Sequence, residues 1–220
     1  MIWSWIPRNA DLILSLLGEH LVLSLVPVVI GLVVSVPLGW LANRSVAARA
    51  ILIPSAGILY TIPSLVLFIV LPSILGTKIL NPINVVVALA IYTVALLVRS
   101  VADALAAVPS AVIAAATAMG FRSLRRFATV DFPLAIPVLI AGLRVATVSN
   151  ISLVSVGAAI GIGGLGQLFT DGYDRSFPTE IVTGIALSML LALLADAALL
   201  ALGRLATPWN RVGTAAGRTS

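Results

Sequence analysis

Charged residues are so sparse along this chain that five long stretches carry at most one each. A helix needs about 20 apolar residues to cross the hydrocarbon core of a bilayer. Only 10% of the residues are charged and 60% are hydrophobic, so a soluble domain could not cover itself with polar side chains. These stretches lack the alternation of apolar and polar residues that the strands of a membrane barrel need, so we expect them to be helices. We expect an all-α integral membrane protein with about five transmembrane helices, at residues 21–40, between Arg49 and Lys78, and at 79–98, 137–160 and 181–202.

The basic residues orient these spans, because cytoplasmic loops of membrane proteins carry an excess of arginine and lysine. With the N-terminus outside, nine basic residues fall on the inner side and three on the outer side. The chain is therefore predicted to run N-out and C-in. Residues 1–20 are expected to form an interfacial segment, 21–207 a single transmembrane domain and 208–220 a cytoplasmic tail. The inner set is Arg44, Arg49, Arg99, Arg122, Arg125, Arg126, Arg204, Arg211 and Arg218, and the outer set is Arg8, Lys78 and Arg175.

The second span is interrupted by prolines 54, 63 and 72. Proline removes a backbone hydrogen bond and kinks a helix, which membrane helices tolerate where neighbours satisfy the freed carbonyl. The string "TIPS" at residues 61–64 predicts a break in the middle of this span. A packing kink and a role in a transport pathway are equal alternatives for Pro63. Tyr60 and Tyr92 are candidates for lining a pathway, with core packing as the alternative for each.

A basic insert of roughly thirty residues separates the third and fourth spans, at about 103–133. Its Ala-rich part, residues 110–119, favours a helix, and Gly120 is well placed to end that helix in a left-handed conformation. The string "FRSLRRF" predicts a second short helix with Arg122, Arg125 and Arg126 facing water or lipid phosphate. Physical reasoning alone leaves two alternatives, a docking element or an interfacial anchor.

The stretch "AAATAMGFRSLRRFATVDFPLAIP" resembles the signature of bacterial ABC importer permeases of the type I fold. Ala114 stands where that signature has glutamate. In that family the segment is a coupling helix that fits a cleft on a cytoplasmic ATPase. The resemblance implies that the contacting residues here are Ala114, Ala115, Ala116, Gly120, Phe121, Arg122, Phe132 and Pro133.

Other strings, among them "YTIPSLVLFIVLP" and "GAAIGIGGLGQLFTDG", are similar to permeases for osmoprotectants such as glycine betaine, choline and carnitine. The resemblance implies a multi-pass subunit of a bacterial cytoplasmic membrane. It also implies two ATP-binding subunits, a second permease subunit, identical or homologous, and an extracytoplasmic substrate-binding protein. A methionine or phosphonate permease of the same architecture is one alternative, and an ATP-independent channel or ion-coupled carrier is another.

Several other functions find no support in the sequence. The one lysine, Lys78, lies outside any phosphate-binding loop motif, so ATP hydrolysis is expected on a partner chain. The glycines of "GIGGLG" are expected to allow a tight turn or close packing. The chain has no cysteine, and its one histidine, His20, is expected to be exposed just before a span. We therefore expect no catalytic residue, metal or cofactor, and no nucleic-acid partner.

Two charges lie inside predicted spans, Arg144 in the fourth and Asp196 in the fifth. Ionisable residues in a membrane usually find a partner. Counted from the inner interface at about 1.5 Å per residue, the two lie at similar depth. We therefore predict an ion pair between these spans, either holding the bundle together or contacting substrate.

Overall fold

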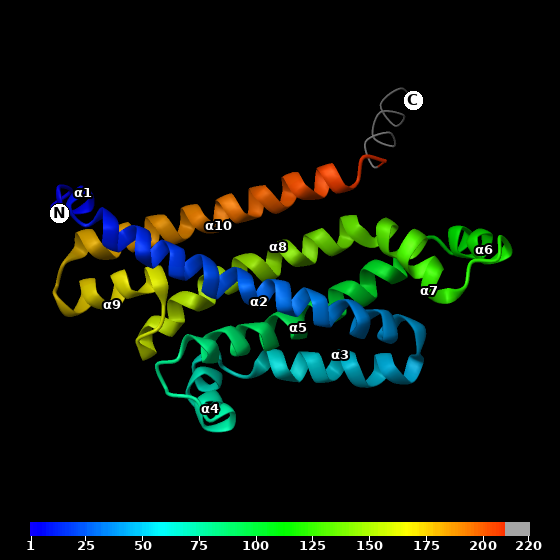
Figure 1. Cartoon of the computed structure of the whole chain (residues 1–220), viewed down its shortest axis with the longest axis horizontal. Helices are drawn as coiled ribbons and strands as arrows, with labels where there is room; N and C mark the ends of the chain where they lie inside the picture. The colour runs from blue at the N-terminus through cyan, green and yellow to red at the C-terminus, as the bar shows by residue number, and fades with distance from the viewer. Residues whose placement is uncertain (210–220) are drawn as a thin grey trace.

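Four long helices, α2, α5, α8 and α10, run along the length of the molecule and form a bundle (Figure 1). The computed structural model describes residues 1–209, and within them every regular element is helical. The α-helices are α1 (Trp5–Arg8), α2 (Ala10–Arg44), α3 (Val46–Thr61), α4 (Ser64–Leu75), α5 (Pro82–Ala106), α6 (Ser110–Ala118), α7 (Ser123–Arg126), α8 (Phe132–Gly157), α9 (Gln167–Asp174) and α10 (Pro178–Ala206).

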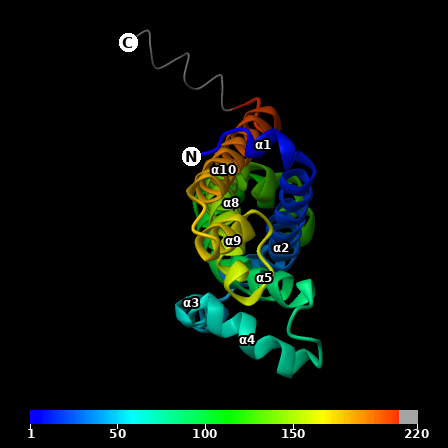
Figure 2. The ribbon, with the colours of Figure 1, turned by 90° about the vertical axis from the view of Figure 1, so that its left-hand side faces the viewer.

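The four long helices are each long and apolar enough to cross a membrane, and a fifth span is present if α3 and α4 count as one. That pair is bent by 101° where the sequence predicted a break. Viewed end-on, α3 and α4 lie to one side of the main bundle (Figure 2). The expectation of an all-α membrane protein with about five spans is confirmed.

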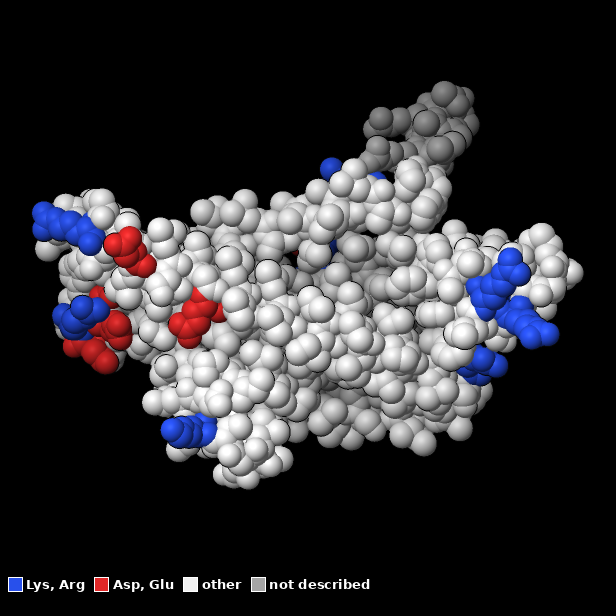
Figure 3. All heavy atoms as spheres, in the orientation of Figure 1, with Lys and Arg blue, Asp and Glu red and all other residues white. Residues whose placement is uncertain are grey.

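On the face shown in Figure 3, most charged side chains gather near the two ends of the bundle and few lie between them. Following the predicted orientation, we call the end that carries α6 and α7 the inner end, and the end with α1 and α9 the outer end. The band between them matches the surface that a helix bundle presents to lipid.

Local sequence signals begin and end these helices. The Ser45 hydroxyl accepts from the Ala48 amide at 3.3 Å at the start of α3. The Asn81 side chain accepts from the Ile83 amide at 3.1 Å at the start of α5, where Pro82 occupies the first turn. Such caps satisfy amides that have no partner within the helix. At its far end, α4 stops at a glycine in the left-handed region.

The N-terminal segment differs from its prediction. Residues 1–20 were expected to be interfacial, but from Ala10 onwards they belong to α2, which is one helix of 35 residues. His20 is wholly buried rather than exposed. The reason is helical spacing: Leu16, His20 and Leu23 share one face, and that face packs on the bundle. The predicted tail lies almost entirely outside the described residues.

The second short helix of the insert, α7, is present but runs on into the fourth span. A π-helical turn, Phe127–Asp131, joins α7 directly to α8, so the fourth span begins before its predicted start. The turn lies just before Pro133, which has no amide to donate to the carbonyl four residues earlier. The wider turn therefore coincides with an interruption in the backbone hydrogen-bond ladder of the helix.

Candidate functional site

The inner end of the molecule carries α6 and the turn that follows it (Figure 1). Ala114 and Ala115 are exposed on this helix, and Ala116 is buried beneath them. Gly120 then has φ of +84°, in the left-handed region, as its position predicted. The amide of Phe121 donates to the Ala116 carbonyl at 3.2 Å and closes the helix end. The result is a short, exposed helix of small side chains, with a shape suited to a cleft.

A polar clamp ties this helix to the start of α8. Arg126 donates to the Thr117 hydroxyl at 3.0 Å and to the Asp131 carboxylate at 3.2 Å. Arg126 was expected to face water or lipid phosphate. That expectation is wrong, because only 24% of its side chain is exposed and its guanidinium bonds to two residues of the protein. A π-helical turn places residues five apart on the same side of the helix, and this brings Arg126 next to Asp131. Arg122 stays exposed, and Arg125 lies over the Phe121 ring at 5.0 Å.

Apolar contacts anchor the insert to three long helices. The Phe127 ring lies 5.3 Å from that of Trp40 in α2 and 5.6 Å from that of Phe132 in α8. Ile113 of α6 packs on the cluster that α5 and α8 form at this end. Pro133 lies in the first turn of α8. A force applied to α6 would therefore reach α2, α5 and α8 together.

The structure brings Arg144 and Asp196 together between α8 and α10. The guanidinium donates to both carboxylate oxygens, at 2.7 and 2.6 Å. Two parallel bonds of this kind are the strongest form of an arginine–carboxylate pair. About a third of each side chain is exposed in the isolated chain, 33% and 32%. A half-exposed ion pair at this depth requires either water or another protein surface over it, because lipid cannot solvate it.

The residues expected near the broken span also meet. The rings of Tyr60 and Tyr92 lie 5.7 Å apart, edge to face. Tyr92 is buried, and its hydroxyl donates to the Ile62 carbonyl, directly before Pro63. That bond satisfies a carbonyl at the break, so Tyr92 has a structural role there. Tyr60 stays half-exposed beside a pocket of about 340 Å³ between α3 and α5.

At the outer end, His20 holds the loop between α8 and α9 in place. Its Nδ1 accepts from the Leu165 amide at 3.2 Å, so its Nε2 carries the hydrogen that it donates to the Ile151 carbonyl at 3.0 Å. Gly164, at φ of +47°, lies directly against His20, where a Cβ atom would stand 2.7 Å from the His20 Cβ atom and 2.8 Å from its Cα and N atoms. The expected close packing of the "GIGGLG" glycines is confirmed. The apolar residues at helical spacing around His20 were the signal that it is buried.

Sequence reasoning missed a buried acid at the same end. Glu180, in the first turn of α10, is fully buried, and Arg175 donates to both of its carboxylate oxygens at 2.7 and 2.8 Å. The sequence predicted only that Arg175 lies on the outer side, and it indicated no partner for it. The spacing of five residues between Arg175 and Glu180 across a proline-containing turn gives no standard pairing signal.

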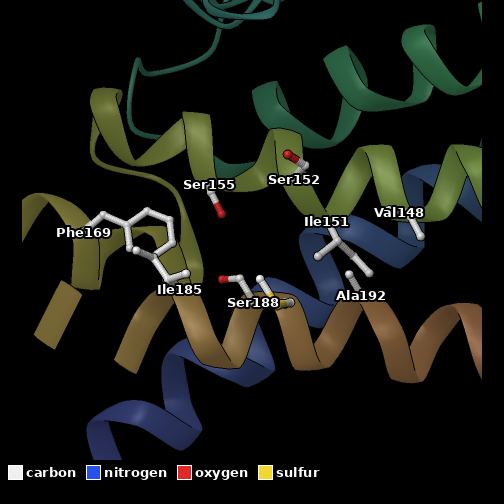
Figure 4. Close-up of a pocket in the computed structure, with 9 residues that line it drawn as sticks. Val148, Ile151, Ser152, Ser155, Phe169, Ile185, Ser188 and Ala192 are labelled. Atoms are coloured by element: carbon white, nitrogen blue, oxygen red, sulfur yellow. The ribbon is translucent and has the colours of Figure 1, made fainter. Parts of the chain in front are cut away.

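A pocket of about 300 Å³ lies between α8, α9 and α10 near the outer end (Figure 4). The hydroxyls of Ser155 and Ser188 face each other across it, beside the ring of Phe169. Ser188 Oγ is buried and has no hydrogen-bond partner among residues 1–209. The same residues include no cluster of three or more metal-ligand side chains. The lining is Val148, Ile151, Ser152, Ser155, Phe169, Ile185, Ser188, Met189 and Ala192.

Residues 27–208 match the family described as the inner membrane component of binding-protein-dependent transport systems. The chain belongs to this family. The match covers the insert, the ion pair and the pocket between α8, α9 and α10, and it leaves out α1 and the first half of α2. This permease component therefore has its candidate coupling element and its pockets within the shared part of the fold.

Curated relatives of this permease component are similar over most of its length. It is 34% identical over 191 residues to the osmoprotectant import permease protein OsmW of Salmonella typhimurium, covering 86% of this chain and 88% of that one. It is 30% identical over 205 residues to the glycine betaine/carnitine/choline transport system permease protein OpuCB of Bacillus subtilis, covering 93% of each. It is 39% identical over 165 residues to the ergothioneine transport permease/ergothioneine binding protein EgtU of Helicobacter pylori, where it spans only 29% of that protein.

Solved structures share the fold of this permease component. An inward-facing conformation of the MetNI methionine ABC transporter matches with a TM-score of 0.80 at 24% identity, over 91% of this chain and 98% of that one. An amino acid ABC transporter crystallised with histidines matches with a TM-score of 0.75 at 19% identity, over 93% and 98%. These likenesses establish the type I importer permease fold.

Proposed function

We propose that this chain is the transmembrane permease subunit of an ATP-driven importer of osmoprotectants in a bacterial cytoplasmic membrane. The observation that best supports this proposal is the exposed α6–Gly120 element at the inner end, which is anchored to α2, α5 and α8. Such an element suits the transfer of motion from a cytoplasmic ATPase to the bundle. The substrates we propose are glycine betaine, choline, carnitine or similar quaternary ammonium compounds, as the names of two relatives suggest.

The proposed importer function also implies the partners of this subunit. One bundle of four or five spans is too small to enclose a path, so a second permease subunit, identical or homologous, would complete the pore. Two ATP-binding subunits would engage the inner ends, and a substrate-binding protein would dock on the outer side. ATP hydrolysis would take place on the partner chains, so this subunit is proposed to be no enzyme. Nucleotide would then bias a two-state pore through the coupling elements.

Ala114 replaces the glutamate of the coupling signature, and the structure suggests why the helix is stable without it. The Arg126 clamp joins Thr117 of α6 to Asp131, and so holds α6 by a different set of side chains. We propose that Ala114, Ala115, Phe121 and Arg122 contact the ATPase, while Gly120, Phe132 and Pro133 set the geometry. Tyr60 is the remaining candidate for lining a pathway.

Uptake into vesicles tests the proposal. Vesicles that contain this chain with its ATPase, partner permease and binding protein would receive labelled glycine betaine, with ATP inside. We expect ATP-dependent uptake that choline and carnitine block and that methionine and proline do not. Uptake without ATP would overturn the importer, favouring a channel or carrier. ATP-dependent uptake of methionine or phosphonate alone would change the cargo and retain the architecture.

Gly120 gives a direct test of coupling. A left-handed conformation costs a residue with a side chain about 1–2 kcal/mol, and asparagine tolerates it better than alanine. No atom lies within 4 Å of the position of a new Cβ atom, so strain is the only cost. We expect Gly120→Ala to lower ATP-driven uptake more than Gly120→Asn, at equal membrane abundance of the chain. Equal uptake by both variants would contradict a role for this turn.

A further inference from the structure

Phe169 of α9 stands between two pockets at the outer end of the molecule. It lines the hydroxyl-bearing pocket of about 300 Å³ between α8, α9 and α10. It also lines a second pocket, of about 440 Å³, between the end of α8 and α9. We call these the inner and the outer pocket. The second one is lined by Ala158, Ala159, Phe169, Thr170, Tyr173 and Asp174.

The position of the Phe169 ring is set by the packing of α9 on α10. Gly184 of α10 lies against this ring, so closely that a Cβ atom there would stand 2.6 Å from Cε1. Gly172 of α9 faces Ile181 of α10 with a corresponding distance of 2.7 Å. Two glycines thus let the helices approach, and the ring is held at the boundary of the two pockets.

The outer pocket carries the chemistry that attracts an organic cation. It is lined by the aromatic residues Phe169 and Tyr173 and by Asp174, whose carboxylate takes part in none of the salt bridges found within residues 1–209. Aromatic rings attract quaternary ammonium groups through the negative potential of their faces. A nearby carboxylate adds to that attraction without a hydrogen bond, which a quaternary nitrogen cannot donate.

The inner pocket carries hydroxyls but no charge. In Figure 4, Ser155 of α8 and Ser188 of α10 point toward each other, with Phe169 at one side and Ile151 and Ala192 at the other. A buried hydroxyl without a partner is destabilising until something bonds to it. Ser188 is such a group, and a substrate carboxylate or hydroxyl would satisfy it.

The Arg144–Asp196 pair lies further toward the inner end on α8 and α10. Val148 and Ala192, at the inner limit of the pocket, lie one helical turn from Arg144 and Asp196. The opposite flank, between α2, α8 and α10, is a groove of about 470 Å³ lined by aliphatic residues and Thr147. Lipid or another helix suits that groove. A polar solute suits the flank that carries Phe169 and the ion pair.

We propose that Phe169 forms the centre of a transit subsite for the quaternary ammonium group of the substrate, an inference that rests on the proposed function. The ammonium group first meets Asp174, Tyr173 and Phe169 in the outer pocket. It then passes the ring, while the polar end of the substrate bonds to Ser188 in the inner pocket. The neutralised Arg144 below leaves no free cation to repel it. We expect the substrate to bind this subsite weakly, because it must leave the subsite again during transport.

Direct binding without the binding protein tests this subsite. The permease–ATPase complex in lipid nanodiscs would be titrated with labelled choline, and with the uncharged tert-butyl analogue of choline as competitor. We expect Phe169→Ala to weaken choline binding about tenfold, and Phe169→Tyr to keep it. The competitor should displace choline poorly from the wild-type complex. Leu194→Ala, on the aliphatic flank of α10, is the matched control and should bind choline as the wild-type does.

Three outcomes would overturn the subsite. Equal choline binding by Phe169→Ala and Leu194→Ala, in a complex that imports quaternary ammonium compounds, would refute the subsite alone. If Phe169→Ala instead lowers only the ATP hydrolysis that the binding protein stimulates, the surface is a docking site for that protein. If the wild-type vesicles import no quaternary ammonium compound at all, the proposed function fails, and the subsite with it.

Discussion

Arg144 and Asp196 show how much one residue pair can constrain a membrane helix bundle. Each would be costly alone within an apolar span. Their bidentate contact joins α8 to α10, whose other contacts in this region are aliphatic. Because a third of each side chain is exposed, the pair also marks a flank of the bundle that lipid cannot cover. We therefore expect water or a second permease subunit there.

The ion pair predicts a specific pattern of stability. Asp196→Asn leaves an uncompensated guanidinium between the helices, whereas Arg144→Gln combined with Asp196→Asn leaves two neutral groups that can still bond. We expect the single variant to lower the thermal unfolding midpoint of the purified protein more than the double variant does. If the two variants unfold at the same temperature, the charges contribute independently and the pairing has no energetic weight.

At the scale of elements, close approach between helices depends on small residues. Gly39 of α2 lies where a Cβ atom would stand 2.5 Å from that of Val101 in α5. The α2–α5 contact also buries Ser35, whose hydroxyl donates to the Val94 carbonyl at 3.5 Å. In a membrane, such packing replaces the hydrophobic effect as the source of helix association. The insert at the inner end depends on this frame for its attachment.

Two glycines of α2 form a matched pair that tests this packing. Gly39→Ala forces its methyl group onto Val101, and overpacking of this kind costs about 1–3 kcal/mol. Gly18→Ala meets no atom within 4 Å, and alanine is the better helix former by about 1 kcal/mol. Chemical denaturation in detergent should therefore show a loss of stability for Gly39→Ala and none for Gly18→Ala. Equal stability of the two variants would argue against a tight α2–α5 crossing.

At the scale of the whole molecule, most charged side chains gather near the two ends of the bundle (Figure 3), and the Arg144–Asp196 pair lies between them. The exposed arginines of the insert belong to the predicted inner end, and the acidic residues of α9 to the outer end. The candidate coupling element and the Phe169 pockets therefore lie at opposite ends, joined by α8, which extends from one to the other (Figure 1).

The absence of cysteine from the sequence makes the orientation directly testable. Leu124→Cys and Tyr173→Cys place single thiols at exposed positions, with 67% and 78% of the native side chains accessible. In intact cells a membrane-impermeant maleimide should label Tyr173→Cys alone. Leu124→Cys should react only after the membrane is opened. Labelling of both variants in intact cells would contradict the N-out, C-in arrangement.

The sequence alone determined the class, the approximate spans, the break before Pro63 and the Gly120 turn. Each follows from a local property: apolar length, the missing amide of proline or the freedom of glycine at positive φ. The intramembrane ion pair was also inferred, because unpaired charges in lipid are too costly to leave alone.

Only the tertiary structure decided where side chains meet across distant helices. His20 was expected to be exposed, yet Ile151 and Leu165, far along the chain, bind both of its ring nitrogens. Arg126 was expected to face water or lipid phosphate, yet a π-helical turn brings Asp131 to it. The Phe169 pocket needs α8, α9 and α10 together. Such contacts depend on helix rotation and depth, which packing sets and which hydropathy along one chain does not encode.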